Sequence, residues 1–412
     1  MSFNNVFGGI ARALSHSGYR LLWWSNGTNT VGRWIFKVSV GWLTWEMTGS
    51  TAWLGIVAFA DTFPMVIMTI IAGVWADRIG YLRLMKYSQL ILVIGGFITA
   101  TLALVGALNV ELIIILCVIV GSAEAMTIPA RMSFVHNLVP KSDLSAAIAL
   151  NSTTYNVARF LGPALFGILI QFIDISFIIL VSAIMFFIFY IALFFQKNDE
   201  IVNSGENKKR ILGDLLDGFR YALSNSGIFF LLFLLCVTAI LIRPYIELVP
   251  GIADQVFSMG AEGVSIILSS TGLGATVGGV LLARHGKVEG LTSIFTWSLV
   301  ISAVAMVLFL FSQNIWMSSI FIALVGMTIV AGSITSQTLI QNTAPDQLRA
   351  RIISITAVLS WGLPAVGAAV MGWVAEFIGL TITLLVGSIV TGILWIWAHV
   401  ERKKHSIILE KQ

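Results

Sequence analysis

Long apolar runs of about 20 residues or more, separated by short polar connections, fill almost the whole chain. A run of this length crosses the hydrocarbon core of a bilayer as one helix. Only 11% of the 412 residues are charged, and the mean hydropathy is +0.94, whereas about a quarter of a soluble domain is charged. So apolar a chain cannot cover itself with a polar surface, and the sequence therefore predicts a polytopic membrane protein.

The runs predict an all-α integral membrane fold with twelve transmembrane helices. Lys and Arg gather at both chain ends and in the connections after the even-numbered spans, whereas the opposite connections carry acids. By the positive-inside rule, this asymmetry places both termini in the cytoplasm, and it also explains the net charge of +4 without nucleic-acid binding. The predicted spans are 20–46, 51–76, 84–107, 111–131, 144–172, 175–195, 226–250, 261–283, 290–312, 315–342, 349–376 and 380–398.

The two halves of the chain resemble each other at an offset of about 205 residues. "GVWADRIGYLR" from Gly73 aligns with "GVLLARHGKVE" from Gly279, and both follow an even-numbered span. Parallel six-helix repeats are typical of two-lobed transporters. We therefore predict an N-terminal lobe over 1–195, a cytoplasmic linker with an amphipathic helix over 196–225, and a C-terminal lobe with a cytoplasmic tail over 226–412.

One connection is unusually rich in charge. The stretch "GVWADRIGYLRLMK", from Gly73 to Lys86, resembles the loop 2–3 signature of the major facilitator superfamily, with Tyr81 and Leu82 where that pattern prefers basic residues. The resemblance implies a conformational latch, in which a carboxylate at a helix end pairs with a helix start or an arginine of the other lobe. The alternative is a solvated loop that only sets topology. The candidate latch residues are Gly73, Asp77, Arg78, Gly80 and Arg83.

A second stretch, "RFLGPALFGILI", resembles part of the helix 5 signature of drug–proton antiporters through Arg159, Gly162, Pro163 and Gly167. Proline removes a backbone donor and glycine admits a neighbouring helix. Gly274 and Gly278 give the span 261–283 a GxxxG face. We expect this face and the Gly162–Pro163 face to pack against each other across the lobes, the alternative being ordinary helix packing.

Most of the first half also resembles the major facilitator subfamily of the enterobactin exporter and macrolide efflux proteins. The carriers of this resemblance include "GRWIFKVSVGWLTWEMTGS" and "DTFPMVIMTIIAGVWADR". It implies export of a siderophore or an amphiphilic drug-like molecule in exchange for protons. The expected location is the bacterial cytoplasmic (inner) membrane, and the expected transporter is a monomer. A lysophospholipid flippase or a metabolite importer on the same fold is the alternative.

Charged side chains inside the spans are functional candidates, because each one is costly in lipid. In the family, helices 1, 4, 7 and 10 line the cavity, so the resemblance implies that Arg33, Lys37, Arg243 and Glu247 bind substrate, together with Trp34 and Trp361. The acids Asp61 and Glu124 are the candidate proton carriers, since drying favours a neutral carboxyl and a nearby cation favours the anion. The alternatives are permanently paired structural charges and tryptophans that only pack or face lipid.

The sequence gives little support to an enzyme. It contains no HExxH, no GxSxG and no G-x-x-x-x-G-K-[ST] motif, so neither a metal, nor an activated nucleophile, nor a nucleotide is implied. An intramembrane enzyme is accordingly a weaker hypothesis. We expect no cofactor and no metal, and the partners implied are a small molecule, protons and the bilayer.

Overall fold

The computed structural model describes residues 3–196 and 211–411, and within these ranges the chain is helical without a β-strand. The helices cluster into two compact units. Unit 1 comprises Met1–Thr48 and Ala60–Gly205, and unit 2 comprises Gly49–Phe59 and Glu206–Gln412. Residues 49–59 thus cluster with unit 2, although unit 1 flanks them in the sequence.

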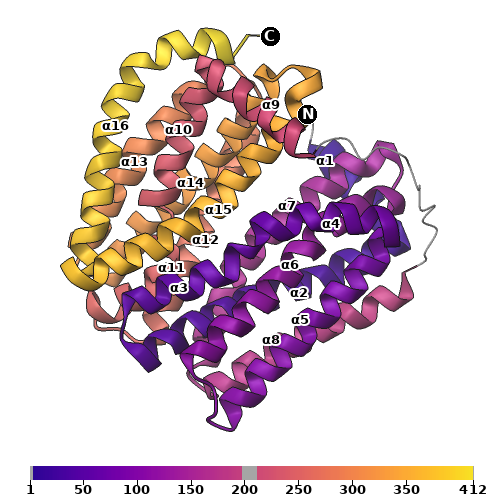
Figure 1. The fold of residues 1–412 in the computed structure, drawn as a ribbon, viewed down its shortest axis with the longest axis vertical. Coiled ribbons are helices and arrows are strands. Elements are labelled where there is room, and N and C mark those ends of the chain that lie inside the picture. Colours follow the sequence, from indigo (N-terminus) through magenta and orange to yellow (C-terminus); the bar gives the residue numbers. More distant parts are fainter. Residues whose placement is uncertain (1–2, 197–210, 412) are drawn as a thin grey trace. The chain divides into compact units, whose positions relative to one another are not determined.

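Unit 1 holds the N-terminal helix and the helices of the first six predicted spans, coloured indigo to magenta in Figure 1. The second of these spans begins within unit 2, as α3. The helices are α1 (Phe3–Ser15), α2 (Ser17–Thr48), α3 (Thr51–Thr62), α4 (Pro64–Ile79), α5 (Tyr81–Leu104), α6 (Val110–Leu138), α7 (Lys141–Leu169), α8 (Ile175–Ala192) and the 3₁₀ turn η1 (Leu193–Phe195).

Unit 2 holds the remaining helices, coloured from magenta through orange to yellow in Figure 1. The predicted interfacial helix is present as α9, although the side chains of its residues 211–217 lie outside what the structure describes. The helices are α9 (Ile211–Ser224), α10 (Ser226–Leu241), α11 (Tyr245–Gln255), α12 (Ala261–His285), α13 (Leu291–Phe311), α14 (Ile315–Thr343), α15 (Asp346–Ile378) and α16 (Leu380–Leu409).

The same five helix pairings occur in both units. In unit 1, α2 packs on α7 and α8, α5 packs on α6 and α8, and α4 packs on α6. In unit 2, α10 packs on α15 and α16, α13 packs on α14 and α16, and α12 packs on α14. Each pairing in one unit corresponds to the pairing about 205 residues away in the other. The internal repeat seen in the sequence is thus also a repeat of packing.

Two glycines at equivalent positions make very close contacts with a facing helix. A Cβ on Gly121 of α6 would collide with the backbone carbonyl of Asp61, and a Cβ on Gly326 of α14 would collide with that of Thr271. Glycine lets two helix backbones approach where any larger residue would hold them apart. These two positions are 205 residues apart, so the repeat extends to single contacts.

Short polar residues fix where several helices begin. Asn109 accepts a hydrogen bond from the Leu112 N–H at 2.9 Å, Asp174 from the Ser176 N–H at 2.8 Å, and Asn314 from the Trp316 N–H at 2.9 Å. Such caps satisfy backbone donors that have no partner inside the first helical turn. They place these helix starts within a few residues of the predicted span starts.

Two predicted spans are broken, which the sequence analysis did not expect. The span 51–76 is interrupted at Phe63 between α3 and α4, and the span 226–250 is interrupted at residues 242–244 between α10 and α11. Pro64 directly follows the first break, and Pro244 lies in the second. Proline disfavours a continuous helix because it has no N–H to donate and its ring clashes with the preceding turn. Asp61 lies two residues before the first break, and Arg243 lies within the second.

Among the described residues, ten helices are long and apolar enough to cross a membrane. The helices of two other predicted spans, α2 with 32 residues and α7 with 29, are long enough but richer in polar residues. These two helices pack on each other in unit 1. The ten apolar helices show a multi-pass membrane fold. The total of twelve transmembrane helices stays a prediction.

Candidate proton and substrate sites

Arg33 of α2 lies between two carboxylates of unit 1. Its Nη2 donates to Asp61 Oδ1 of α3 at 2.5 Å, and its Nε donates to Glu124 Oε2 of α6. The three side chains are 12%, 9% and 25% exposed, respectively. Gly121, one turn before Glu124, admits the Asp61 backbone and so brings the two acids to the same arginine. The structure therefore unites three residues that the sequence analysis singled out separately.

The cluster of Arg33, Asp61 and Glu124 carries one positive and two negative formal charges. Buried ions are costly unless they are paired and hydrogen-bonded. A third nitrogen of the arginine, Nη1, is buried without a hydrogen-bond partner among the described residues. With a formal charge of −1, the cluster becomes neutral when one carboxyl gains a proton.

Arg131 is a site residue that the sequence analysis missed, since it counted this residue only among the loop charges after span 4. The structure places it within α6, where its Nη1 donates to the Asn26 side-chain carbonyl of α2. Glu124 and Arg131 are seven residues apart, which is two helical turns, so they share one face of α6. That spacing was the available signal.

Trp34 and Lys37, both candidates for the substrate cavity, lie together on α2. The Lys37 Nζ is 5.8 Å from the centroid of the Trp34 ring, and the Arg159 Cζ of α7 is 5.7 Å from it. The sequence analysis assigned Arg159 to helix packing. The structure instead places its guanidinium beside a candidate substrate residue.

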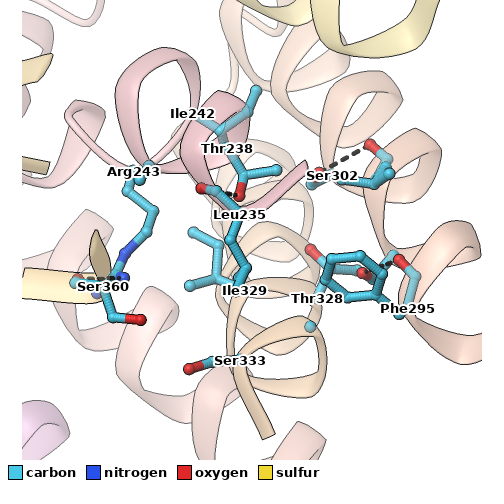
Figure 2. A pocket seen from close by; sticks show the side chains of 14 residues that line it. Leu235, Thr238, Ile242, Arg243, Phe295, Ser302, Thr328, Ile329, Ser333 and Ser360 are labelled. Carbon is cyan, nitrogen blue, oxygen red and sulfur yellow. Dashed lines mark hydrogen bonds between the residues drawn. The ribbon is translucent and has the colours of Figure 1, made fainter. Parts of the chain in front are cut away.

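In unit 2, Arg243 and Trp361 line the same cavity. Arg243 follows the end of α10, and its Nη1 donates to the Ser360 carbonyl of α15 at 2.8 Å (Figure 2). Both Arg243 and Trp361 line a cavity of about 190 Å³ with Gln337 and Thr356. Glu247, the remaining candidate, lies in the first turn of α11 and is not among the residues that line this cavity.

A second cavity, of about 30 Å³, shares Arg243, Ser333 and Ser360 with the first. Its wall is rich in hydroxyls that the sequence analysis did not single out, among them Thr238, Ser298, Ser302 and Thr328 (Figure 2). Such a space admits water, while pockets that enclose drug-sized ligands measure roughly 300–1,000 Å³. Neither cavity of unit 2 alone encloses such a ligand.

Comparison with known proteins decides which family this architecture belongs to. A profile of the transmembrane secretion effector family of the major facilitator superfamily matches residues 10–405. The protein belongs to this family. It is accordingly a multi-pass membrane transporter of small molecules and not an enzyme.

Two relatives of this secretion-effector chain have descriptive names. The staphyloferrin A transporter of Staphylococcus aureus is 24% identical over 368 residues, which cover 88% of this chain and 90% of that protein. The multidrug efflux pump Tap of Mycolicibacterium fortuitum is 22% identical over 368 residues, covering 87% and 89%. Both relatives match over nearly the whole chain.

Solved structures share the fold of this secretion effector at low sequence identity. The nucleoside transporter NupG has a TM-score of 0.73 with 13% identity, covering 93% of this chain and 99% of that one. A bacterial homologue of the lysosomal transporter Spinster, in an inward-facing and unoccupied conformation, has a TM-score of 0.71 with 14% identity, covering 95% and 97%. These likenesses show a transporter fold of the major facilitator type.

The candidate latch of this transporter is only partly visible. Gly80 joins α4 to α5 with φ of 88°, a conformation that favours glycine, so the expected tight turn is present. Arg78 and Arg83 are exposed. The side chain of Asp77 lies outside what the structure describes. A Cβ on Gly73 would meet no described atom within 4 Å. The latch role stays a prediction.

The predicted helix-packing glycines each make close contacts within their own unit. A Cβ on Gly162 of α7 would collide with the Trp34 Cβ of α2, and Cβ atoms on Gly274 and Gly278 of α12 would collide with the Ala323 and Met327 carbonyls of α14. Pro163 and Gly167 are buried in an unbroken α7. Packing of these faces against each other across the lobes stays a prediction.

No group of three or more His, Cys, Asp and Glu side chains in the described ranges is placed to hold a metal ion. The candidate site of unit 1 has only two carboxylates, and an arginine occupies the space between them. The three side chains of this site therefore form ion pairs with one another.

Proposed function

We propose that this protein exports an amphiphilic small molecule, a siderophore or drug-like compound, from the bacterial cytoplasm by alternating access in exchange for protons. The observation that carries the proton coupling is the position of Arg33 between Asp61 and Glu124. The direction and substrate class are supported by the relatives, a staphyloferrin A transporter and a multidrug efflux pump.

The coupling follows from the charges of this cluster. With both carboxyls ionised, Arg33 is held from two sides, by Asp61 and by Glu124. Protonation of Glu124 removes one of the charge-assisted hydrogen bonds, which are the strong ones in a site of low dielectric. Arg33 is then held only by Asp61, and α2 and α6 lose a link. A proton that binds here thus changes which helices are joined.

The sequence contains no phosphate-binding loop of the G-x-x-x-x-G-K-[ST] type, so we propose that the proton gradient drives transport. Export should stop when the proton-motive force collapses, because a carrier without an energy source only equilibrates its substrate. Export that persists after complete collapse would contradict the coupling.

The test compares two acids of the same helix. Glu124→Gln keeps the shape of the side chain but cannot release a proton, whereas Glu111→Gln alters an exposed acid at the start of α6. In proteoliposomes with a pH gradient, Glu124→Gln should abolish uphill transport while downhill exchange continues. Glu111→Gln should transport like the wild type. Cells that express each variant are compared for siderophore secretion and for resistance to a drug panel.

Asp61→Asn completes the test. If Glu124→Gln pumps normally and Asp61→Asn does not, the proton-carrying role belongs to Asp61. If both variants pump normally, the cluster of Arg33 with the two acids is structural and the coupling proposal fails.

We also propose that both termini lie in the cytoplasm, on the basis of the Lys and Arg asymmetry. Cysteines placed at Gln171 and at Lys287 test this orientation, since both residues are exposed and lie in opposite connections. A membrane-impermeant thiol reagent added to intact cells should label position 171 but not 287. The reverse pattern would overturn the topology.

A further inference from the structure

The helices α13 and α16 of unit 2 meet through a group of aromatic rings near one end of each. The Trp297 ring of α13 lies 5.5 Å, centroid to centroid, from the rings of both Trp395 and His399 of α16, and these two are 5.3 Å apart. Trp395 and His399 are four residues apart and therefore share a face of α16. We call these three residues the ring cluster.

The ring cluster reaches the outer surface of unit 2 through Trp297, which is 44% exposed. This tryptophan begins an exposed apolar stripe that continues along α13 through Ile301, Val304 and Leu308. The spacing of three and four residues keeps all four side chains on one side of the helix. An exposed apolar stripe on a membrane helix is a surface that lipid acyl chains can cover.

Arg402 lies one turn beyond the ring cluster on the same face of α16, three residues after His399. Its Nη1 donates to the Ser293 hydroxyl of α13 at 3.0 Å, and Ser293 precedes Trp297 by four residues. Arg402 and the ring cluster therefore lie along the same seam between α13 and α16. Because the hydroxyl of Ser293 is neutral, the hydrogen bond leaves the charge of Arg402 unbalanced.

The acids at this end of α16 are engaged by other groups. Glu401 contacts Lys404 at 3.6 Å and His405 at 3.8 Å, while Glu410 accepts hydrogen bonds from two backbone N–H groups at the start of α13. Arg402 forms no ion pair with a carboxylate of the described residues, and it is only partly buried. An anion from the surroundings can therefore reach this guanidinium.

The spacing along α16 matches the layers of a bilayer. Tryptophans gather at the boundary between acyl chains and headgroups, and Arg402 lies seven residues beyond Trp395, about 10 Å at 1.5 Å per residue. This step brings a cation from the tryptophan layer to the layer of the lipid phosphates. A guanidinium can form two parallel hydrogen bonds with one phosphate, and the exposed Lys403 adds a second positive charge.

We propose that Arg402, Ser293 and Trp297 form a binding site for an anionic phospholipid, with the phosphate on Arg402 and an acyl chain along the apolar stripe of α13. This inference goes beyond the proposed function, because it concerns a lipid of the bilayer and not the exported molecule. Phosphatidylcholine also carries a phosphate, but its choline cation opposes the attraction to Arg402. The site therefore distinguishes lipids by their net charge.

The test measures which lipid lies beside Trp297 of the full-length protein in reconstituted bilayers. Brominated acyl chains quench tryptophan fluorescence at short range, and the contribution of Trp297 is the difference between the wild type and Trp297→Phe. Brominated phosphatidylglycerol should quench this contribution at an about fivefold lower mole fraction than brominated phosphatidylcholine, the preference expected for one cation near an anionic lipid. Equal quenching by the two lipids would overturn the proposal.

Two variants of the same helix then locate the charge. Arg402→Gln should abolish the preference for phosphatidylglycerol at Trp297, whereas Lys404→Gln should keep it, because the Lys404 ammonium is paired with Glu401. Each variant removes one positive charge from the same end of α16. Equal losses of preference would therefore show a diffuse surface potential and overturn the site. Arg402→Lys keeps the charge and should retain part of the preference.

A further measurement uses the wild type alone and decides the question if Arg402→Gln does not fold. Phosphatidylglycerol with a photoreactive group in its headgroup should label residues 287–298 or 395–404, and labelling confined to other segments would overturn the assignment. Soluble glycerol 3-phosphate has the phosphate without acyl chains and should not displace the lipid at millimolar concentrations. Displacement by glycerol 3-phosphate would show a site for free phosphate esters, and the lipid assignment would be wrong.

Discussion

The interiors of the two units differ sharply although their helices pack in the same pairs. Unit 1 places Arg33 between two carboxylates. The positions 205 residues after Arg33 and Glu124 are Thr238 and Ile329, and both line the small cavity of unit 2. An ion cluster in one repeat is thus replaced by a hydroxyl, an apolar side chain and a space of about 30 Å³ in the other.

This difference shows which features a duplicated fold retains. The glycines that set the distances between helices, Gly121 and Gly326, are present in both units and touch backbone carbonyls in both. The ion cluster of Arg33, Asp61 and Glu124 occurs in unit 1, where proton coupling is proposed. The packing of the helices therefore repeats between the units, whereas the ion cluster of Arg33, Asp61 and Glu124 does not.

The largest expected effect is that of Arg33→Gln compared with Arg243→Gln. Removal of one partner from a buried ion pair costs about 3–5 kcal/mol, because the remaining charge stays buried. Arg33→Gln should therefore abolish transport and lower the melting temperature by several degrees. Arg243→Gln removes a hydrogen bond to the neutral Ser360 carbonyl and should lower it less. Thermal unfolding in detergent measures both.

A double variant provides the control for this first prediction. Arg33→Gln combined with Glu124→Gln removes one charge of each sign and should recover part of the lost stability, but not proton-driven transport. Equal losses of stability in Arg33→Gln and Arg243→Gln would contradict the prediction that the ion-paired arginine of unit 1 contributes more to stability than the arginine of unit 2.

The second prediction concerns the equivalent glycines. Gly121→Ala and Gly326→Ala should each cost about 1–3 kcal/mol, since a Cβ would collide with a carbonyl of the facing helix. The carbonyl that faces Gly121 belongs to Asp61, so Gly121→Ala should also displace this acid from Arg33 and reduce transport strongly. Gly326→Ala faces the Thr271 carbonyl and should leave transport of the folded fraction near the wild-type rate. Transport loss of the same size in both would contradict the comparison.

The sequence predicted the helices well because a bilayer demands apolar runs of one length. It did not predict the breaks before Pro64 and at Pro244, since proline alone does not decide them. Pro129, Pro163 and Pro364 lie inside unbroken helices. Whether a proline breaks a helix depends on whether neighbouring groups satisfy the freed carbonyls, and this is a property of tertiary packing.

The candidate site was predicted as a set of residues but not as an arrangement. Arg33, Asp61 and Glu124 were found because charges inside spans are costly, whereas their mutual contact depends on how α2, α3 and α6 are rotated and on the close approach at Gly121. Arg131 was missed because it lies near the end of its predicted span. Its interior position follows from the face that α6 turns toward Asn26.

The third prediction tests why residues 49–59 cluster with unit 2. Glu376 of α15 accepts hydrogen bonds from the Ser50 hydroxyl at 2.9 Å, the Thr51 hydroxyl at 3.1 Å and the Ala52 N–H at 3.3 Å. Loss of a carboxylate cap costs about 1 kcal/mol, so Glu376→Ala should speed hydrogen exchange in the first turn of α3 about fivefold. Glu262→Ala, an exposed acid at the start of α12, should not.

The smallest expected effect concerns how each unit holds a terminal helix. In unit 2, Glu410 accepts hydrogen bonds from the backbone N–H groups of Gly290 and Thr292, both at 2.8 Å. In unit 1, Asp143 of α7 instead contacts two side chains near the N-terminus, His16 at 3.1 Å and Arg12 at 3.2 Å. The hydrogen bonds from His16 and Arg12 lower the pKa of Asp143 below its ordinary value.

The sign of the pH dependence follows from this lowered pKa of Asp143. A carboxyl whose pKa is lower in the folded state stabilises that state above its unfolded pKa, about 3.9, and the contribution disappears as the pH falls through the folded value. A spin label at exposed Ala11 of α1 should therefore stay immobile from pH 7 down to about pH 4 and gain mobility below it. In Asp143→Asn the label should already be mobile at pH 7, because the neutral amide holds Arg12 only weakly. Equal mobility of the label at pH 3 and pH 7 would show that the ionisation of Asp143 does not hold α1 against α7.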